Sequence, residues 1–166
     1  MAIEKIIFAA GCFWGVQAYI KKVKGVLNTT VGYCGGHTEN PSYEQVCTGK
    51  TGHAESVLIE FDNEIVSLGE LLEHFWKIHD PTSLNRQGAD VGTQYRSAIF
   101  YFNEGQKKII EESKKKQDES GKHKFPIVTQ IAPATDFYKA EEYHQDYLDK
   151  NPNGYCHIDL SLLDNY

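Results

Sequence analysis

The sequence contains a motif suited to nucleophilic chemistry, Gly-Cys-Phe-Trp-Gly at residues 11–15. An apolar run ends before Cys12 and apolar residues at helical spacing follow it, so the cysteine is predicted between a strand and a helix. Backbone N–H groups at a helix N-terminus favour a thiolate, which predicts a lowered thiol pKa, and Gly11 should leave the sulfur accessible. Phe13 and Trp14 point in different directions on a helix, so at least one should lie beside the sulfur. Cys12 is therefore predicted to be a reactive nucleophile, with a buried structural cysteine as the alternative.

A second motif, Gly-His-Ala-Glu at residues 52–55, opens a predicted strand. Glu55 alternates with Val57 and Ile59, so it should share their apolar face. Burial disfavours the charged form of a carboxyl group, which predicts a raised pKa and a proton donor usable at neutral pH. The alternative is an exposed glutamate at a strand end. His53 is either a base or part of the loop packing.

Two tyrosines in predicted loops, Tyr43 and Tyr95, are candidates for hydrogen-bond donation beside this acid. Together they would form a clamp for a developing oxyanion. Asp90 is either a second carboxylate of that clamp or a loop cap. Considered alone, each tyrosine could equally be a surface loop residue without a role in the site.

The elements that must position these residues follow a regular order. Helices are predicted at 13–23, at 68–78 with a capping box of Ser67 and Glu70, at 103–120 and at 139–148. Strands are predicted at 6–10, 26–33, 54–61, 97–102 and 127–131, with long loops at 34–53 and 79–95. This order predicts an α+β fold: a two-layer, ferredoxin-like split β-α-β core with an appended strand, an appended helix and an irregular C-terminal tail. We expect one domain over residues 1–166.

Composition narrows the class of protein. The 166 residues are 40% hydrophobic and 24% charged, as in an ordinary globular domain. Seventeen Lys and Arg against 23 Asp and Glu leave a net charge of −6, which argues against nucleic-acid or anionic-membrane binding. No stretch approaches the roughly 18 apolar residues of a membrane span, and the run at 6–10 is too short for a signal peptide. We expect a cytoplasmic protein whose four cysteines meet a reducing environment.

Taken together, several blocks of sequence resemble the A-type peptide-methionine sulfoxide reductases over nearly the whole chain. The blocks are Gly-Cys-Phe-Trp-Gly at 11–15, Gly-Tyr-Cys-Gly-Gly at 32–36, Asn-Pro-Ser-Tyr at 40–43, Gly-His-Ala-Glu at 52–55, His-Asp-Pro-Thr at 79–82, the run at 85–97, Tyr-His-Gln at 143–145 and Asn-Pro-Asn-Gly-Tyr-Cys at 151–156. Several such blocks in order along the chain are a more specific signal than any one block.

The resemblance implies a role for each candidate residue. Cys12 would be the nucleophile, and Glu55 the acid that protonates the sulfoxide oxygen. Tyr43 and Tyr95 would hydrogen-bond that oxygen, and Asp90 would order the site through water. The pocket for the substrate S-methyl group would be formed by Phe13, Trp14 and Tyr43.

The resemblance also implies the reaction and its partners. The family reduces the S epimer of methionine sulfoxide, free or in proteins and peptides, and thioredoxin usually regenerates the enzyme. Dithiothreitol would replace thioredoxin in vitro. A thiol that attacks sulfur leaves a sulfenic acid, which a second thiol converts to a disulfide. We expect no bound cofactor or metal, and a monomer.

Cys156 is the predicted resolving thiol. It ends the segment at 151–156, where Pro and Gly interrupt any helix and favour a mobile chain. No cysteine follows it, which excludes a relay through a second tail cysteine. Cys34 and Cys47 are predicted to be structural thiols. Of the two, Cys34 is the better candidate for a redox role because glycines flank it.

Two other classes of function remain open from the residues alone. One is a cysteine hydrolase in which Cys12 pairs with His53 or His157. The other is a peptide-binding or heavy-metal-binding module that uses the four cysteines. A hydrolase would form an acyl-enzyme, a binding module would show no turnover, and a reductase would consume thiol equivalents.

Overall fold

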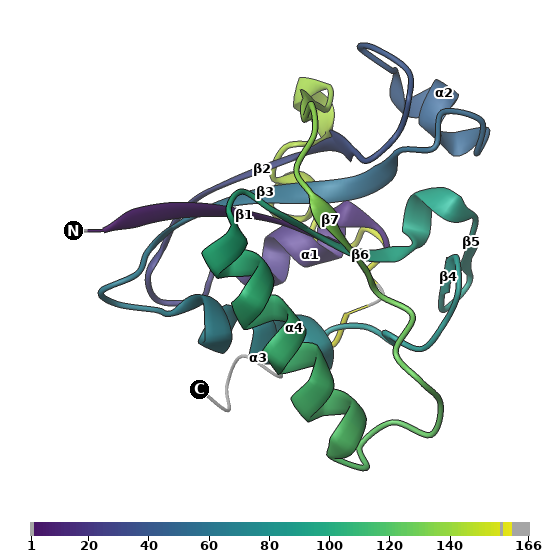
Figure 1. The fold of residues 1–166 in the computed structure, drawn as a ribbon. Helices are drawn as coiled ribbons and strands as arrows, with labels where there is room; N and C mark the ends of the chain where they lie inside the picture. The colour runs from purple at the N-terminus through teal and green to yellow at the C-terminus, as the bar shows by residue number, and fades with distance from the viewer. Residues whose placement is uncertain (1, 157, 161–166) are drawn as a thin grey trace.

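The computed structural model describes residues 2–156 and 158–160 (Figure 1). The strands are β1 (Ile3–Ala10), β2 (Val26–Cys34), β3 (Ala54–Asp62), β4 (Arg86–Gln87), β5 (Asp90–Val91), β6 (Ser97–Tyr101), β7 (Gln130–Pro133) and β8 (Tyr138–Lys139). The α-helices are α1 (Phe13–Ile20), α2 (Tyr43–Cys47), α3 (Leu68–Lys77), α4 (Glu104–Glu119) and α5 (Tyr147–Lys150), and two 3-10 helices are η1 (Thr93–Tyr95) and η2 (Glu142–His144). Across the described ranges, every helix is too short or too polar to cross a bilayer.

The six-stranded sheet has the order β7-β6-β1-β3-β2-β8. Its four central strands are antiparallel neighbours, β8 pairs antiparallel with β2, and β7 pairs in parallel with β6. The units β1-α1-β2 and β3-α3-β6 interleave so that β3 lies between β1 and β2. This arrangement confirms the predicted split β-α-β core.

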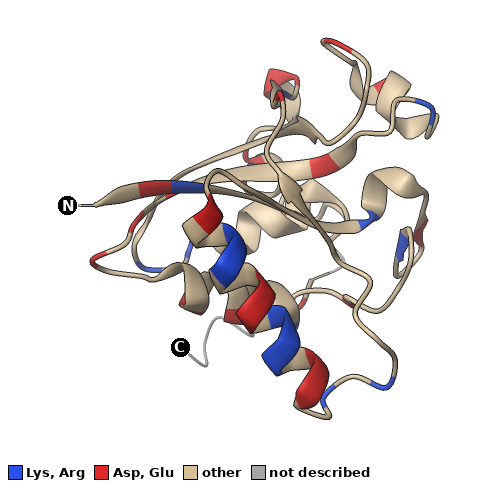
Figure 2. Ribbon diagram, in the orientation of Figure 1, with Lys and Arg blue, Asp and Glu red and all other residues tan. Residues whose placement is uncertain are grey.

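The two faces of the sheet are covered differently. On one face, strand residues such as Phe8 and Ile59 pack against α1 and α3 in the main hydrophobic core. Helix α4 lies against α3, where Trp76 Nε1 donates to Ser113 Oγ at 2.8 Å (Figure 1). On the other face, a smaller cluster including Phe100 is covered by the segment that leads from β7 to β8 and contributes Phe137. Figure 2 shows that α4 carries charges of both signs along its length.

Two helix starts confirm their predicted caps. The Ser67 side chain accepts from the backbone N–H of Glu70 at 3.1 Å and begins α3. The Glu70 carboxylate, however, contacts the Ser67 hydroxyl, and no complete capping box forms there. The Asn103 side chain accepts from the N–H of Gln106 at 2.9 Å and begins α4. Satisfying free N–H groups in this way stabilises a helix N-terminus.

The long loops contain structure that was not predicted. Residues 34–53 include the five-residue helix α2, which begins at a complete capping box between Ser42 and Gln45. Residues 79–95 include the hairpin of β4 and β5 and the turn η1. The strand expected at 127–131 lies instead at 130–133.

The helix predicted at 139–148 is wrong. Lys139 belongs to β8, which pairs with β2, and two short helices, η2 and α5, follow. The Gln145 side chain bonds both backbone groups of Val31 and the carbonyl of Ala140, at 2.9–3.1 Å. Asp146 then takes a left-handed conformation with φ 53°. These contacts with β2 override the local helical spacing.

Candidate active site

Cys12 lies where the sequence predicted it, between β1 and α1. Gly11 has φ 93°, a conformation that a side chain would oppose, and makes the tight turn out of the strand. Cys12 is the N-cap residue of α1, whose first residue is Phe13. Ala10, two residues before Cys12, pairs with Ser97 of β6, so the thiol lies just beyond the end of a central strand.

The predicted chemistry of the Cys12 thiol is wrong in two respects. Its side chain is only 6% exposed, so the sulfur is not openly accessible. Burial raises the thiol pKa, and the nearby charge of Glu55 raises it further. The backbone N–H of Trp14 donates to the sulfur and lowers the pKa by less than burial raises it. Desolvation therefore outweighs the helix N-terminus, and the thiol is protonated in this state.

Glu55 confirms the expectation of a buried acid. It lies opposite Tyr33 in the β2–β3 ladder and is 1% exposed. Its Oε1 accepts from the backbone N–H of Phe13 at 3.2 Å, which brings the carboxyl group against the first turn of α1. Burial raises its pKa to about 8, against a lowering by the Phe13 N–H, and the charge of Asp90 adds to the rise. At neutral pH the acid holds its proton.

Tyr43 and Tyr95 approach this acid from two different elements. Tyr43 is the first residue of α2, and its backbone N–H donates to Glu141 Oε2 at 3.0 Å. Tyr95 ends η1. Burial raises the pKa of both phenols, and the charge of Glu55 raises both further. Both hydroxyl groups therefore remain hydrogen-bond donors close to Glu55.

Asp90 lies at the start of β5, on the hairpin beside the site. Its charge raises the pKa of both Cys12 and Glu55, so it is near both groups. The Tyr155 hydroxyl bonds its side chain, and within the described residues its Oδ2 is buried without a hydrogen-bond partner. A buried carboxylate oxygen without a protein partner fits the expected role of ordering water.

Aromatic rings surround the start of α1. Phe13 is fully buried and its ring stacks with Tyr43 at 6.4 Å between centroids. Trp14 is half-buried, as expected for one of the two adjacent aromatics, and stacks on Tyr147 at 3.8 Å. His144 lies among these rings and was not predicted as a site residue. The Tyr-His-Gln block at 143–145 was the available signal for it.

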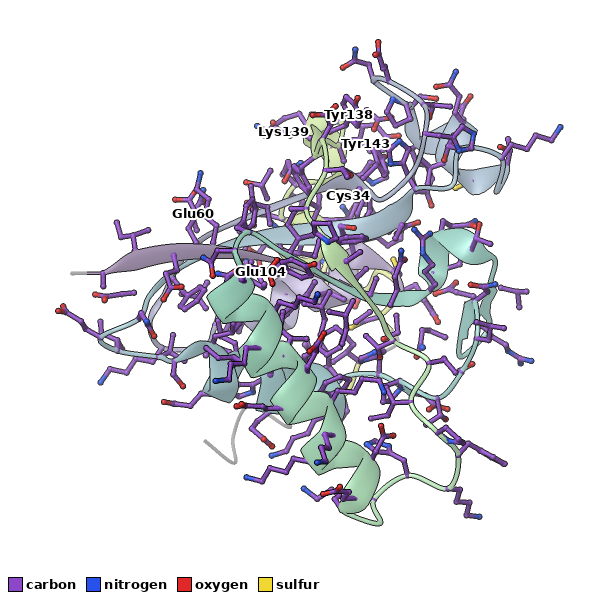
Figure 3. All side chains as sticks on the ribbon, viewed as in Figure 1. Cys34, Glu60, Glu104, Tyr138, Lys139 and Tyr143 are labelled. Carbon is purple, nitrogen blue, oxygen red and sulfur yellow. The ribbon has the colours of Figure 1, made fainter. Side chains whose placement is uncertain are left out.

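The three other cysteines occupy different surroundings. Cys156 is half-buried against the main core, its thiol donates to the carbonyl of Ile158 at 3.3 Å, and its charge contributes to the raised pKa of Cys12. Cys34 is buried at the end of β2 in the cluster on the opposite face of the sheet (Figure 3). Cys47 is exposed on α2 and its thiol hydrogen-bonds with Tyr43. The flanking glycines favoured Cys34 over Cys47 for a redox role, but Cys34 is buried and Cys47 is exposed.

The hydrolase alternative finds little support in the position of His53. Its ring is buried in the loop, where Nδ1 accepts from the Gly36 N–H at 3.0 Å and Nε2 bonds the Thr38 carbonyl at 2.8 Å. Both nitrogens are engaged away from Cys12. His157 lies outside the described residues. Among the residues that are described, no group of three His, Cys, Asp or Glu side chains could hold a metal ion.

Known proteins resemble this chain throughout its length. The family described as peptide methionine sulfoxide reductase matches residues 4–165. A peptide methionine sulfoxide reductase MsrA of Clostridium acetobutylicum is 58% identical over 161 residues, 97% of this chain and 98% of that relative. The reduced form of Mxr1 from Saccharomyces cerevisiae has a TM-score of 0.89 at 37% identity, covering 95% of this chain and 92% of that one. Mxr1 in complex with Trx2 has a TM-score of 0.63 at 26% identity, over 88% and 85%.

Proposed function

This chain belongs to the peptide methionine sulfoxide reductase family, and from that premise we propose how its own residues bind the sulfoxide, reduce it and recover. The enzyme reduces the S epimer of methionine sulfoxide to methionine. We assign the substrate S-methyl group to the aromatic pocket of Phe13, Trp14 and Tyr43. Ring faces of this kind fit a small apolar group and exclude water from the reacting sulfur.

The observation that carries the chemical proposal is the buried carboxyl group of Glu55 against the first turn of α1, where burial raises its pKa to about 8. Sulfoxide oxygen is a poor leaving group until it is protonated. Glu55 gives its proton to that oxygen, and Tyr43 and Tyr95 donate hydrogen bonds to it. A neutral Glu55 also spares Cys12 the repulsion that a carboxylate would exert on a forming thiolate.

The oxidation and reduction balance without any further reagent. The Cys12 sulfur bonds to the substrate sulfur, the S–O bond breaks, and the protonated oxygen leaves as hydroxide. That hydroxide then bonds to the Cys12 sulfur as the S–S bond breaks, so that two electrons pass from the cysteine to the substrate. The products are methionine and a Cys12 sulfenic acid, and the thiol proton restores the acid form of Glu55. Asp90 orders water at the site.

Recovery of the enzyme uses a second thiol. The Cys156 thiol attacks the Cys12 sulfenic acid, forming a Cys12–Cys156 disulfide and releasing water. A dithiol then reduces the disulfide and is itself oxidised. We assign this role to thioredoxin, because the similar Mxr1 of Saccharomyces cerevisiae is seen in complex with Trx2. Dithiothreitol would serve in vitro.

We extend the proposal to substrates, setting and assembly. Oxidised proteins, peptides and free methionine sulfoxide are the substrates, so the enzyme repairs oxidative damage. A cytoplasmic location fits four cysteines that all remain thiols. One chain supplies every site residue named above, which fits a monomer. The balanced reaction requires thiols alone, and therefore no bound cofactor.

The decisive experiment is reduction of racemic methyl p-tolyl sulfoxide with dithiothreitol, followed by chiral chromatography. We expect consumption of the S epimer with one equivalent of dithiothreitol oxidised per sulfide formed. Cys12→Ser should abolish this activity, because a hydroxyl group is a poor nucleophile towards sulfur. Activity of that variant within about tenfold of the wild type would contradict the assignment of Cys12. Absence of sulfide from the wild-type enzyme would contradict the proposed function.

A further inference from the structure

We propose that His144 is a positioning residue that fixes the indole of Trp14 in the substrate pocket and thereby sets the affinity for the sulfoxide. The inference rests on the proposed function, because the pocket it concerns is that of Phe13, Trp14 and Tyr43. Nothing in the chemical step requires His144, so the effect falls on substrate binding.

His144 occupies the centre of the aromatic cluster. It ends η2 and is fully buried. Its ring centroid lies 5.2 Å from that of Phe13, 5.9 Å from that of Trp14 and 4.4 Å from that of Tyr43. All three proposed pocket residues therefore contact one side chain that is about 100 positions or more away in sequence from each of them.

The orientation of the indole depends on an acceptor that His144 supplies. Trp14 Nε1 donates to His144 Nδ1 at 3.0 Å. An indole N–H can only donate, so Nδ1 must be unprotonated and the neutral imidazole carries its hydrogen on Nε2. Stacking on Tyr147, at an interplanar angle of 9°, holds the face of the same indole. One hydrogen bond and one stacked ring together determine where the Trp14 ring lies.

The ring of His144 is not explained by packing alone. Its Nε2 is buried and has no hydrogen-bond partner among the described residues. An apolar ring of similar size would fill the same space without leaving a buried donor unpaired. The property that imidazole adds over such a ring is the acceptor for Trp14.

The backbone around His144 is anchored on both sides. Glu141 accepts from the Tyr33 hydroxyl at 2.9 Å and from the Tyr43 backbone N–H at 3.0 Å. Gln145 bonds the backbone of Val31. The same turn thus fixes the start of α2, and with it Tyr43, while His144 fixes Trp14. Two walls of the pocket take their positions from one short segment.

A pair of substitutions separates the acceptor from the ring. In His144→Asn the side-chain oxygen can take the place of Nδ1, whereas His144→Phe keeps a ring and removes the acceptor. Steady-state KM, kcat and the single-turnover rate are measured for methyl p-tolyl sulfoxide with dithiothreitol. We expect His144→Phe to raise KM by about tenfold with kcat within about threefold of the wild type, and His144→Asn to recover most of the affinity.

A double-mutant cycle with Trp14→Phe supplies the second test, because phenylalanine has no N–H to donate. We expect His144→Phe to change KM by less than about twofold in that background. A full effect there, an unchanged KM in His144→Phe, or an equal loss of kcat would overturn the proposal. These outcomes differ from failure of the proposed function, in which the wild-type enzyme itself forms no sulfide.

Discussion

At the scale of single residues, the active site depends on two buried acids, Cys12 and Glu55, whose pKa values are both raised. Burial is the main cause for both Cys12 and Glu55, and the charge of Glu55 adds to the rise at Cys12. Glu55 is desolvated at a buried position of β3, and Cys12 is desolvated at the buried N-cap of α1. Both groups therefore hold their protons before the reaction: Glu55 has the proton that the sulfoxide oxygen needs, and the Cys12 thiol must give up its own as it attacks.

The first prediction concerns Glu55→Gln, which keeps the shape of the side chain and removes its proton. Loss of a general acid typically lowers the rate by about 10²–10⁴-fold. In the wild-type enzyme, the single-turnover rate constant should fall as the pH rises above about 8, where Glu55 loses its proton. The variant should lack this decline. Stopped-flow measurement of methionine formation across this pH range checks both expectations.

A matched control for this prediction lies on the same strand. Glu60 is in β3 at a position that points to the opposite face from Glu55, and it is labelled in Figure 3. Glu60→Gln makes the same chemical change away from the site and should leave the rate at the wild-type value. An equal rate in Glu55→Gln and the wild type would place the acid elsewhere.

The second prediction is that Glu55 lowers the free energy of unfolding as the pH rises. Its pKa is about 8 in the folded protein and 4.5 ordinarily, so between these values the unfolded chain has lost the proton that the folded chain keeps. Stability therefore falls with rising pH through this window. Glu55→Gln should unfold with a free energy higher than that of the wild type by roughly 1–4 kcal/mol near pH 8, and with less difference near pH 5. Urea denaturation at the two pH values measures this, and a constant difference would contradict it.

At the scale of elements, α1 and α3 meet through a buried polar pair that predicts a second pH dependence. The Tyr19 hydroxyl and His74 Nδ1 share a hydrogen bond of 2.7 Å in the core. Burial is the main cause that lowers the pKa of His74, so below about pH 6.5 the unfolded chain takes up a proton that the folded chain resists. Stability should therefore fall as the pH drops from about 7 to about 5.

The measurement for this third prediction compares the wild type with His74→Asn. Asparagine keeps an acceptor near the position of Nδ1 and cannot titrate in this range. Both proteins contain His144, whose pKa burial also lowers, so the difference between their pH profiles isolates His74. Parallel profiles would show that the α1–α3 contact is insensitive to the protonation of His74.

The elements that the sequence predicted are those whose signals are local. Alternation in β3, the buried run of β1 and the caps at Ser67 and Asn103 depend on residues close together in the chain. The segment at 138–150 could not be predicted in this way, because the Gln145 side chain pairs with β2 far back in the sequence. Helix α2 was missed although Ser42 and Gln45 form a local capping box, since it is only five residues long.

At the scale of the whole molecule, the site is assembled from the start of α1, the start of α2, the start of β3, the hairpin of β4 and β5, and the C-terminal segment. Sequence motifs identified Cys12, Glu55 and the two tyrosines as candidates because each has its own chemistry. They could not show that desolvation outweighs the helix N-terminus at Cys12, since burial is set by the assembled layers. Nor could the motifs show that the His144 ring contacts the rings of Phe13, Trp14 and Tyr43, which are distant in sequence.

The fourth prediction also belongs to the whole molecule, because it concerns contact between the two ends of the chain. Cys156 approaches Cys12 closely enough for its charge to raise the pKa of that thiol. It follows α5 by six residues, in a segment without helix or strand, and its thiol is half-buried beside the main core. A short irregular segment can move a thiol through the last distance to a disulfide with little loss of chain entropy.

Cys156→Ser should therefore form one equivalent of methionine at the wild-type rate and then stop. Cys12 should remain a sulfenic acid that reacts with dimedone, and most thioredoxin-supported turnover should be lost. The matched control is Cys47→Ser, because Cys47 is exposed on α2 and hydrogen-bonded to Tyr43, whereas Cys34 lies buried on the other face of the sheet. Mass spectrometry after one equivalent of sulfoxide, without reductant, identifies the disulfide. A Cys12–Cys47 bond in the wild type with Cys156 still a thiol would transfer the resolving role to α2 and leave the reductase chemistry of Cys12 and Glu55 intact.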